Sequence, residues 1–481
     1  MTDTPLKTMQ RLAANTRVGY SFDQEFYTSD AVFKADMDQI ISQKWILAGH
    51  ISRIPNKGDY FLFKIGGEQI IVIRENADSV RAFFNVCRHR GSTICQAESG
   101  NAPRLVCPYH AWTFGLDGRL IAARLMPEDF VKAENGLFAC HIRIFHGLIF
   151  INLSEDEPVD FDATFGDMGP ILDYHGIADA RIAHAGSYPT NANWKLVVEN
   201  FFECYHCVPS HPEFCSIHSA ESILAVGAGP SSGPADAIAS FAPQLSAWEA
   251  SAAALGRPVG TIDDAPDSSH LRLMMQRMNK PDWAAETQDG TAPSPLMGKR
   301  TKADGGRMHL SFSPFSQIVA DDHFVILFQF TPRSALASDV EMIWLVDGRA
   351  REAEVDIDKM IWGYHAKADG GRMHLSFSPF SQIVADDHFV ILFQFTPRAA
   401  LGCDVEMIWL VDGRASDAEV DIEKMIWGYH ATTTQDKVIT ENNQAGIMSS
   451  RYRPGRYSDQ EGSVIKFQKW YLNQFGLARA D

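Results

Sequence analysis

The chain has 481 residues, enough for two or three domains with substantial cores. Its composition, 45% hydrophobic and 21% charged, is typical of a soluble globular protein, and a formal net charge of −17 argues against nucleic acid or an anionic membrane surface as a partner. The longest apolar runs, such as residues 145–153, are too short to span a bilayer, and the N-terminal residues lack the apolar stretch of a secretory signal. We therefore expect a cytoplasmic protein without a membrane partner.

The predicted elements divide the chain into three parts. Residues 1–44 are an N-terminal helical segment, because an apolar stripe with helical spacing runs through residues 20–46. Residues 45–155 contain short alternating or apolar runs separated by turn residues, which is typical of a small all-β domain. Residues 156–481 form a second domain, in which residues 217–301 are rich in Ala, Ser, Gly and Pro and predict an irregular or loosely helical insertion.

The later part of the second domain contains strand-like runs and a helix, and here the sequence repeats itself. Residues 302–366 and 367–431 differ at only six positions, so the period is 65 residues. Two copies are too few for a solenoid. They offer nearly identical strands for the same places in one sheet. We expect the second copy to supply at least the last strand and the helix that follows it, while the surplus residues pack outside, stay poorly ordered or swap between subunits.

Four residues of the β-domain have the pattern of iron–sulfur ligands, namely Cys87, His89, Cys107 and His110. Each Cys/His pair ends a strand-like run, so we expect the pairs on two facing loop tips. Two thiolates on one iron and two neutral imidazoles on the other make a Rieske [2Fe–2S] cluster, whose reduction potential is higher than that of a four-thiolate cluster. The alternative is a structural zinc site. Zinc fingers pair Cys with Cys and His with His, whereas each loop here has one of each, so we predict the Rieske cluster.

A second group of potential ligands follows in residues 193–214. Glu203 and His206 are three residues apart on a predicted helix, and His211 lies just beyond its end. Two imidazoles and one carboxylate form the facial triad of non-haem Fe(II) oxygenases, which leaves positions open for O₂ and substrate. The carboxylate has two candidates at this point, Glu203 nearby and Asp436 on the late helix.

The motifs Cys-x-His-x17-Cys-x-x-His and ENFFECYHCVPSHP resemble the large (alpha) subunits of Rieske ring-hydroxylating and N-demethylating oxygenases, across the whole chain apart from one repeat copy. This resemblance implies an α+β chain, with an all-β Rieske domain followed by a helix-grip catalytic domain in which an antiparallel sheet packs on a long helix. It also implies that His206, His211 and Asp436 bind a mononuclear iron. Glu203 would be the bridge that carries electrons from a Rieske histidine of the neighbouring subunit, and Asn200 would lie near an open iron position.

The Glu in ECYHC and the tail SSRYRPGRYSDQEGSVIKFQKWYL are similar to the glycine betaine, carnitine and choline oxygenases. This similarity implies hydroxylation and N-demethylation of a methylated, quaternary amine. The enzyme would be a homo-oligomer, a trimer in this family, that uses O₂ and electrons from NAD(P)H through a flavin/iron–sulfur reductase. One alternative is a ring-hydroxylating oxygenase acting on an aromatic acid. The other is a Rieske electron carrier without catalytic iron, which leaves His206 and His211 unexplained.

Other Cys and His residues have simpler interpretations. Cys204 and Cys207 flank His206 in a C-x-x-C pattern, but we expect packing thiols there rather than a redox motif. His323 and its repeat counterpart His388 begin a strand, where we expect polar residues with satisfied hydrogen bonds.

Overall fold

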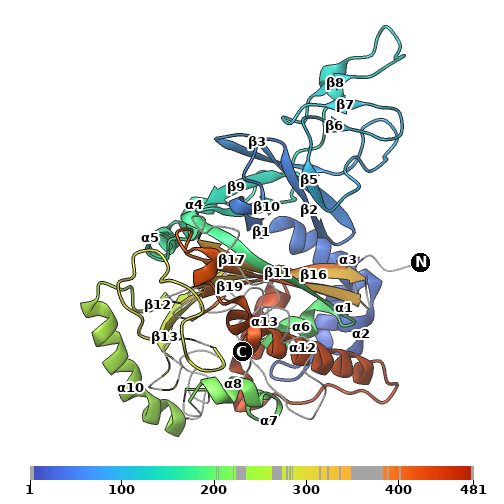
Figure 1. Cartoon of the computed structure of the whole chain (residues 1–481). Coiled ribbons are helices and arrows are strands. Elements are labelled where there is room, and N and C mark those ends of the chain that lie inside the picture. The colour runs from blue at the N-terminus through green and yellow to red at the C-terminus, as the bar shows by residue number, and fades with distance from the viewer. Residues whose placement is uncertain are drawn as a thin grey trace.

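The computed structural model describes residues 5–201, 203, 205–219, 222–223, 235–262, 273–277, 280, 283, 285, 287–313, 316–321, 324–334, 337–347, 383–386, 389–399 and 402–477. Figure 1 shows a β-rich N-terminal domain projecting from a larger domain of sheet and helices. Among the described residues, no helix combines the length and the hydropathy that crossing a bilayer requires.

The N-terminal segment consists of several short helices rather than one helix through residues 20–46. They are α1 (Pro5–Asn15), α2 (Gln24–Thr28) and α3 (Asp30–Gln39). Ser29 separates the last two, and its side chain accepts a hydrogen bond from the Val32 N–H (3.4 Å), which caps α3. The segment packs beside helices of the second domain, as Figure 1 shows, and Tyr20 pairs with Arg456 in an isolated β-bridge.

The β-domain is built from three small antiparallel sheets, as the alternating runs predict. Their strand orders are β4-β3-β2-β5, β1-β10-β9 and β6-β7-β8, and the third sheet forms the tip at the top of Figure 1. The strands are β1 (Ile46–His50), β2 (Asp59–Ile65), β3 (Glu68–Asn76), β4 (Ser79–Phe84), β5 (Ser99–Asn101), β6 (Leu105–Val106), β7 (Thr113–Phe114), β8 (Leu120–Ala122), β9 (His141–Phe145) and β10 (Leu148–Asn152).

The second domain contains a large, mainly antiparallel sheet with helices packed around it, which agrees with the expected α+β class. Its strands are β11 (Ala180–Thr190), β12 (Gly260–Ile262), β13 (Leu273–Arg277), β14 (Gly306–Ser313), β15 (Ser316–Asp321), β16 (Phe324–Ser334), β17 (Ala337–Asp347), β18 (Ile383–Asp386), β19 (Phe389–Ala399) and β20 (Gly402–Val411). Its helices are α4 (Phe161–Phe165), α5 (Gly169–Tyr174), α6 (Trp194–Phe201), α7 (Cys207–Ser210), α8 (Pro212–Ile217), α10 (Ala235–Ala254), α12 (Ile422–Ile447) and α13 (Gly462–Gln474). The 20-residue helix α10 lies within residues 217–301, where we expected an irregular or loosely helical insertion.

Strands from the two repeat copies take equivalent places in this sheet. Both β17 and β20 pair antiparallel with β11, and Gly186 of β11 is paired with Met342 of the first copy and with Met407 of the second. These two methionines are 65 positions apart, so the register is the same for both copies. β20 then runs through residues 412–421 directly into the 26-residue helix α12.

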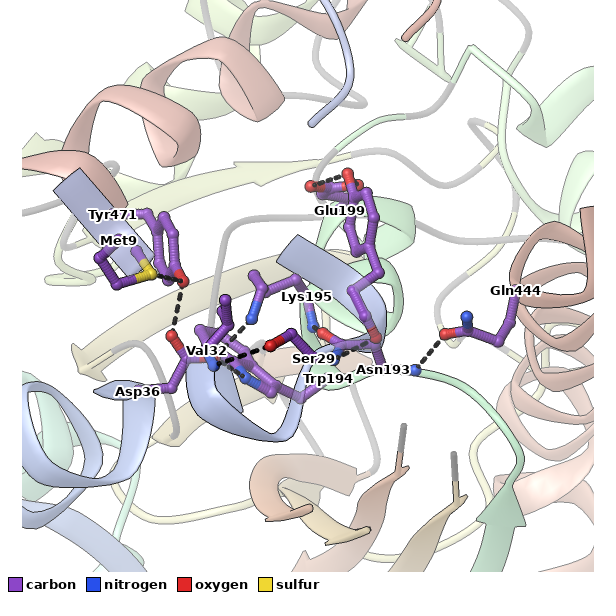
Figure 2. A network of polar contacts seen from close by, with 11 residues as sticks. Met9, Ser29, Val32, Asp36, Asn193, Trp194, Lys195, Glu199, Gln444 and Tyr471 are labelled. Atoms are coloured by element: carbon purple, nitrogen blue, oxygen red, sulfur yellow. Dashed lines mark hydrogen bonds and ion pairs between the residues drawn. The ribbon is translucent and has the colours of Figure 1, made fainter. Parts of the chain in front are cut away.

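Helix α6, which precedes the second group of predicted ligands, is anchored at its N-terminal end by a buried polar network. Asp36 of α3 accepts hydrogen bonds from the Trp194 indole (3.0 Å) and the Tyr471 hydroxyl (2.5 Å), and it forms an ion pair with Lys195 (Figure 2). Both members of the ion pair are fully buried. The Asn193 N–H donates to Gln444 Oε1 of α12 (2.8 Å). The network therefore fixes α6 against the N-terminal segment, α12 and α13.

Candidate metal centres

The two predicted ligand loops of the β-domain have the same backbone geometry. In each loop the cysteine N–H donates to the carbonyl five residues later, and the cysteine carbonyl accepts from the N–H four residues later, at distances between 2.8 and 3.0 Å. The residues at the fourth position, Gly91 and Ala111, both have positive φ angles of 76° and 58°. This left-handed backbone turns each loop back sharply and brings Cys87 and Cys107 toward each other.

These loops place sulfur and nitrogen donors in different environments. Cys87 and Cys107 are buried, whereas His89 and His110 are exposed, with their Nδ1 atoms 3.1 Å apart. The His89 ring also stacks on Trp112. Burial, and to a lesser extent the neighbouring Cys107, raises the pKa of the Cys87 thiol, so the neutral thiol is favoured. A bound metal would reverse this, because a thiol that coordinates a metal ion loses its proton. Two buried sulfurs and two exposed imidazoles fit a Rieske cluster, which Cys87, Cys107, His89 and His110 would hold.

The second group of predicted ligands comes together where α12 passes α7 and α8. The Nε2 atoms of His206 and His211 lie 3.8 and 3.9 Å from the same oxygen, Asp436 Oδ1. One potential ligand atom from each of the three residues lies within 4.8 Å of the others. His211 and Asp436 are buried, and His206 is half-buried. Two imidazole nitrogens and one carboxylate oxygen are the donor set of the non-haem Fe(II) facial triad.

The backbone around the two imidazoles differs from the single helix that the sequence predicts. Helix α6 ends at Phe201, His206 is the residue before α7, and His211 lies between α7 and α8. Pro209 lies inside the four-residue α7, and Pro212 begins α8. Short helices separated by turns, rather than one helical face, therefore place the two imidazoles, whose rings are 5.5 Å apart and inclined at 79°.

Asn200 connects α6 to the carboxylate of the triad. Its Nδ2 donates to Asp436 Oδ1 at 2.6 Å, the oxygen that faces both imidazoles. Burial raises the pKa of Asp436 well above its ordinary value, the Asn200 hydrogen bond lowers it, and the charge of Glu203 raises it further. A divalent cation at this point would offset the cost of ionising the buried carboxyl.

Glu203 lies behind His206 rather than among the converging atoms. Its carboxylate contacts His206 Nδ1 and accepts from the backbone N–H groups of Tyr205 and His206. On the other imidazole the equivalent place is taken by Gln435, whose Oε1 lies 2.8 Å from His211 Nδ1. The sequence analysis missed Gln435, for which the only signal is its position directly before Asp436.

The remaining predictions for Cys and His residues have mixed outcomes. Cys207 is buried but belongs to a disulfide, so the expectation of a packing thiol is wrong for this residue. Cys204, His323 and His388 lie outside the described residues.

Within one chain the two candidate centres lie at opposite ends of the molecule. Figure 1 shows the tip with β6, β7 and β8 at the top, and α7 and α8 at the bottom. The loop with Cys107 and His110 connects β6 to β7, whereas His206 and His211 flank α7. Electrons that move between the two centres of a single chain would have to cross nearly its whole length.

Known families match both parts of the chain. Residues 44–138 match the Rieske [2Fe-2S] domain, and residues 177–362 and 361–476 match the ring hydroxylating alpha subunit (catalytic domain). The chain is 32% identical over 468 residues to the glycine betaine monooxygenase oxygenase subunit of Pseudomonas aeruginosa, covering 95% of this chain and 90% of that one. It is 38% identical over 212 residues to the carnitine monooxygenase oxygenase subunit of Acinetobacter baumannii, covering 43% of this chain and 57% of that one.

Solved structures share the fold at lower identity. A quaternary ammonium Rieske monooxygenase, described in connection with carnitine oxidation by gut microbiota, has a TM-score of 0.59 at 21% identity and covers 97% of this chain and 98% of that chain. Naphthalene 1,2-dioxygenase from Rhodococcus has a TM-score of 0.56 at 15% identity and covers 98% of each chain.

A Rieske domain with β-sheets, joined to a catalytic domain of mixed helix and sheet, defines the class of Rieske-type non-haem iron oxygenases. The chain belongs to the ring-hydroxylating oxygenase alpha-subunit family. It is therefore an oxygen-incorporating oxidoreductase.

Proposed function

We propose that this chain is the oxygenase component that hydroxylates and N-demethylates a methylated quaternary amine such as glycine betaine, carnitine or choline. The convergence of His206, His211 and Asp436 in a chain that also has a Rieske domain carries the oxygenase part of this proposal. The substrate class is supported by the glycine betaine relative, which aligns with 95% of the chain, and by the carnitine relative. The two cofactors would be a [2Fe–2S] cluster held by Cys87, His89, Cys107 and His110, and a mononuclear Fe(II) held by His206, His211 and Asp436.

The overall reaction defines what the chain must provide. The substrate N–CH₃ group, O₂, two electrons and two protons give N–CH₂OH and water, and the hemiaminal then collapses to formaldehyde and the demethylated amine. The bound iron supplies the reductive activation of O₂. Asn200 holds the Asp436 carboxylate by a hydrogen bond, and Glu203 holds the His206 ring so that Nε2 faces Asp436.

Electrons would enter from NAD(P)H through a flavin/iron–sulfur reductase and reach the iron in another subunit. The separation of the two centres within one chain favours this route over transfer inside the chain (Figure 1). We propose a homo-oligomer, a trimer by analogy with the family, in which Glu203 bridges a neighbour's Rieske histidine to His206. We place the protein in the cytoplasm, where the reductase would find reduced nicotinamide.

Replacing His206 by Ala tests the oxygenase function. We expect loss of the mononuclear iron and of substrate-dependent formaldehyde, while the visible spectrum of the cluster stays intact. The matched control is His141→Ala, which removes a half-buried imidazole on β9 and should change neither iron content nor turnover. Unchanged turnover in His206→Ala would exclude a catalytic iron at this site.

The second candidate function is hydroxylation of an aromatic acid. Its ring-hydroxylation part is supported by one relative, the large oxygenase component of a naphthalene 1,2-dioxygenase system, at 36% identity over 210 residues, although naphthalene itself is a hydrocarbon. A panel of glycine betaine, carnitine, choline, stachydrine and benzoates separates the two functions. Formaldehyde from the amines supports N-demethylation, whereas a diol from a benzoate supports the second candidate.

We also propose that the second repeat copy supplies the strand beside β11 in a helix-grip catalytic domain. The direct run from β20 into α12, which carries Asp436, supports this assignment over β17. An intact-mass measurement on the natural protein tests whether the repeat is present. A mass that fits 416 residues, which is the 481-residue chain without one 65-residue copy, would remove the repeat from the protein.

A further inference from the structure

The two imidazoles of the candidate iron site are held from behind by different chemical groups. Glu203, three residues before His206, faces His206 Nδ1 with a carboxylate oxygen. Gln435 comes from α12, 224 positions from His211, and faces His211 Nδ1 with an amide oxygen at 2.8 Å. One imidazole therefore has an anionic partner and the other an uncharged one.

The Gln435 contact selects the tautomer of His211. An amide oxygen only accepts hydrogen bonds, so Nδ1 carries the hydrogen and Nε2 carries the lone pair. Nε2 is the nitrogen that lies 3.9 Å from Asp436 Oδ1. With the amide turned over, an N–H would face Nδ1 and the ring hydrogen would move to Nε2, which could then bind no metal.

Helix α12 reaches the site with two consecutive residues that have different tasks. Gln435 contacts Nδ1 of His211, and Asp436 lies on the opposite side of the ring, near Nε2. The helix is fixed to α6 by the bond from Asn193 N–H to Gln444 Oε1. The position of His211 is thus coupled to that of the carboxylate.

We propose that Gln435 is a positioning residue for His211 and that its lack of charge is part of this role. The inference rests on the proposed iron site. The carboxyl groups of Glu203 and Asp436 already face the two imidazoles. The amide of Gln435 holds the second imidazole without adding a further acidic group to this buried site.

The test measures how fast a chelator removes the mononuclear iron from the holoenzyme, with the absorbance of the cluster as internal standard. Gln435→Leu keeps the size of the side chain and removes the acceptor, so we expect iron to be lost roughly 10- to 100-fold faster. Gln435→Glu keeps an acceptor and adds charge, so we expect iron to be retained at least as long as in the unchanged protein, with a lower Fe(III)/Fe(II) potential. Asn443→Leu is the matched control, because it replaces an exposed amide on the same helix by the same apolar side chain.

The outcomes separate this inference from the proposed function. Fast loss of iron in Gln435→Leu, with retention in both Gln435→Glu and Asn443→Leu, supports it. Equal retention in Gln435→Leu and the unchanged protein overturns it, and so does equally fast loss in Asn443→Leu or in Gln435→Glu. An unchanged protein that holds no mononuclear iron at all would overturn the proposed function instead.

Discussion

Glu199 is a buried carboxyl on α6, and its burial should make the protein less stable as pH rises. The Tyr27 hydroxyl lies 3.0 Å from each carboxyl oxygen and is its hydrogen-bond partner. Burial raises the pKa of Glu199 from an ordinary 4.5 to about 8, Tyr27 and Lys195 lower it, and Glu461 raises it further. Three more phenols interact with it electrostatically, those of Tyr452, Tyr457 and Tyr471.

The direction of the pH effect follows from proton binding. In the unfolded chain Glu199 ionises above its ordinary pKa of 4.5, whereas in the folded chain it keeps its proton up to about pH 8. Between these values the folded state binds more protons, so the free energy of unfolding falls as pH rises. Each pKa unit corresponds to about 1.4 kcal/mol, so the full shift amounts to about 5 kcal/mol, of which about 3 kcal/mol falls between roughly pH 5.5 and pH 8.

Glu199→Gln should remove this dependence, because an amide does not ionise and can still accept from Tyr27. Urea unfolding of both proteins across this pH range should show the variant gaining about 3 kcal/mol relative to the unchanged protein. Titrating groups that do not interact with Glu199 cancel in that difference. Glu155→Gln changes an exposed carboxyl and should give a flat difference. A difference for Glu199→Gln that varies by less than about 0.5 kcal/mol over this range would refute the reasoning.

Three further changes have defined outcomes. Asp36→Asn leaves Lys195 buried without its anion and should lower the free energy of unfolding by about 3–5 kcal/mol. Adding Lys195→Met should restore part of the lost stability, and no recovery in the double variant would contradict the ion-pair account. Asn200→Leu removes the hydrogen bond to Asp436 and should speed loss of the mononuclear iron to a chelator by about tenfold, with unchanged retention as the opposing result. Cys87→Ser should abolish the visible and EPR signals of the cluster and leave the mononuclear iron in place, which a metal count per chain would check.

The parts of the two sites that are close in sequence could be predicted, and those that meet only in three dimensions could not. Cys87 and Cys107 belong to short motifs whose spacing carries the chemistry, and the backbone turns at Gly91 and Ala111 agree with that interpretation. The local pattern left two candidates for the carboxylate ligand, Glu203 and Asp436. Only the family resemblance favoured Asp436, which is distant in sequence. The structure brings Asp436 to the two imidazoles because α12 crosses α7 and α8.

Local signals were only partly informative about the fold of the second domain. The composition of residues 217–301 predicts an irregular or loosely helical segment, and its Ala-rich residues 235–254 form helix α10, since Ala favours helices. The sequence also predicts that Glu203 and His206 share one helix. In the structure α6 ends at Phe201 and His206 directly precedes α7, and the rings of His206 and His211 are inclined at 79° to each other.

The shared register of β17 and β20 on β11 makes the two repeat copies interchangeable neighbours. Gly186 is paired with a methionine of either copy, so the backbone register of β11 does not distinguish the two copies. What distinguishes them is connectivity, because β20 leads into α12. A recombination event that deletes one copy would thus leave β11 with an equivalent partner strand, so the repeat could be gained or lost without a change in the register of that strand.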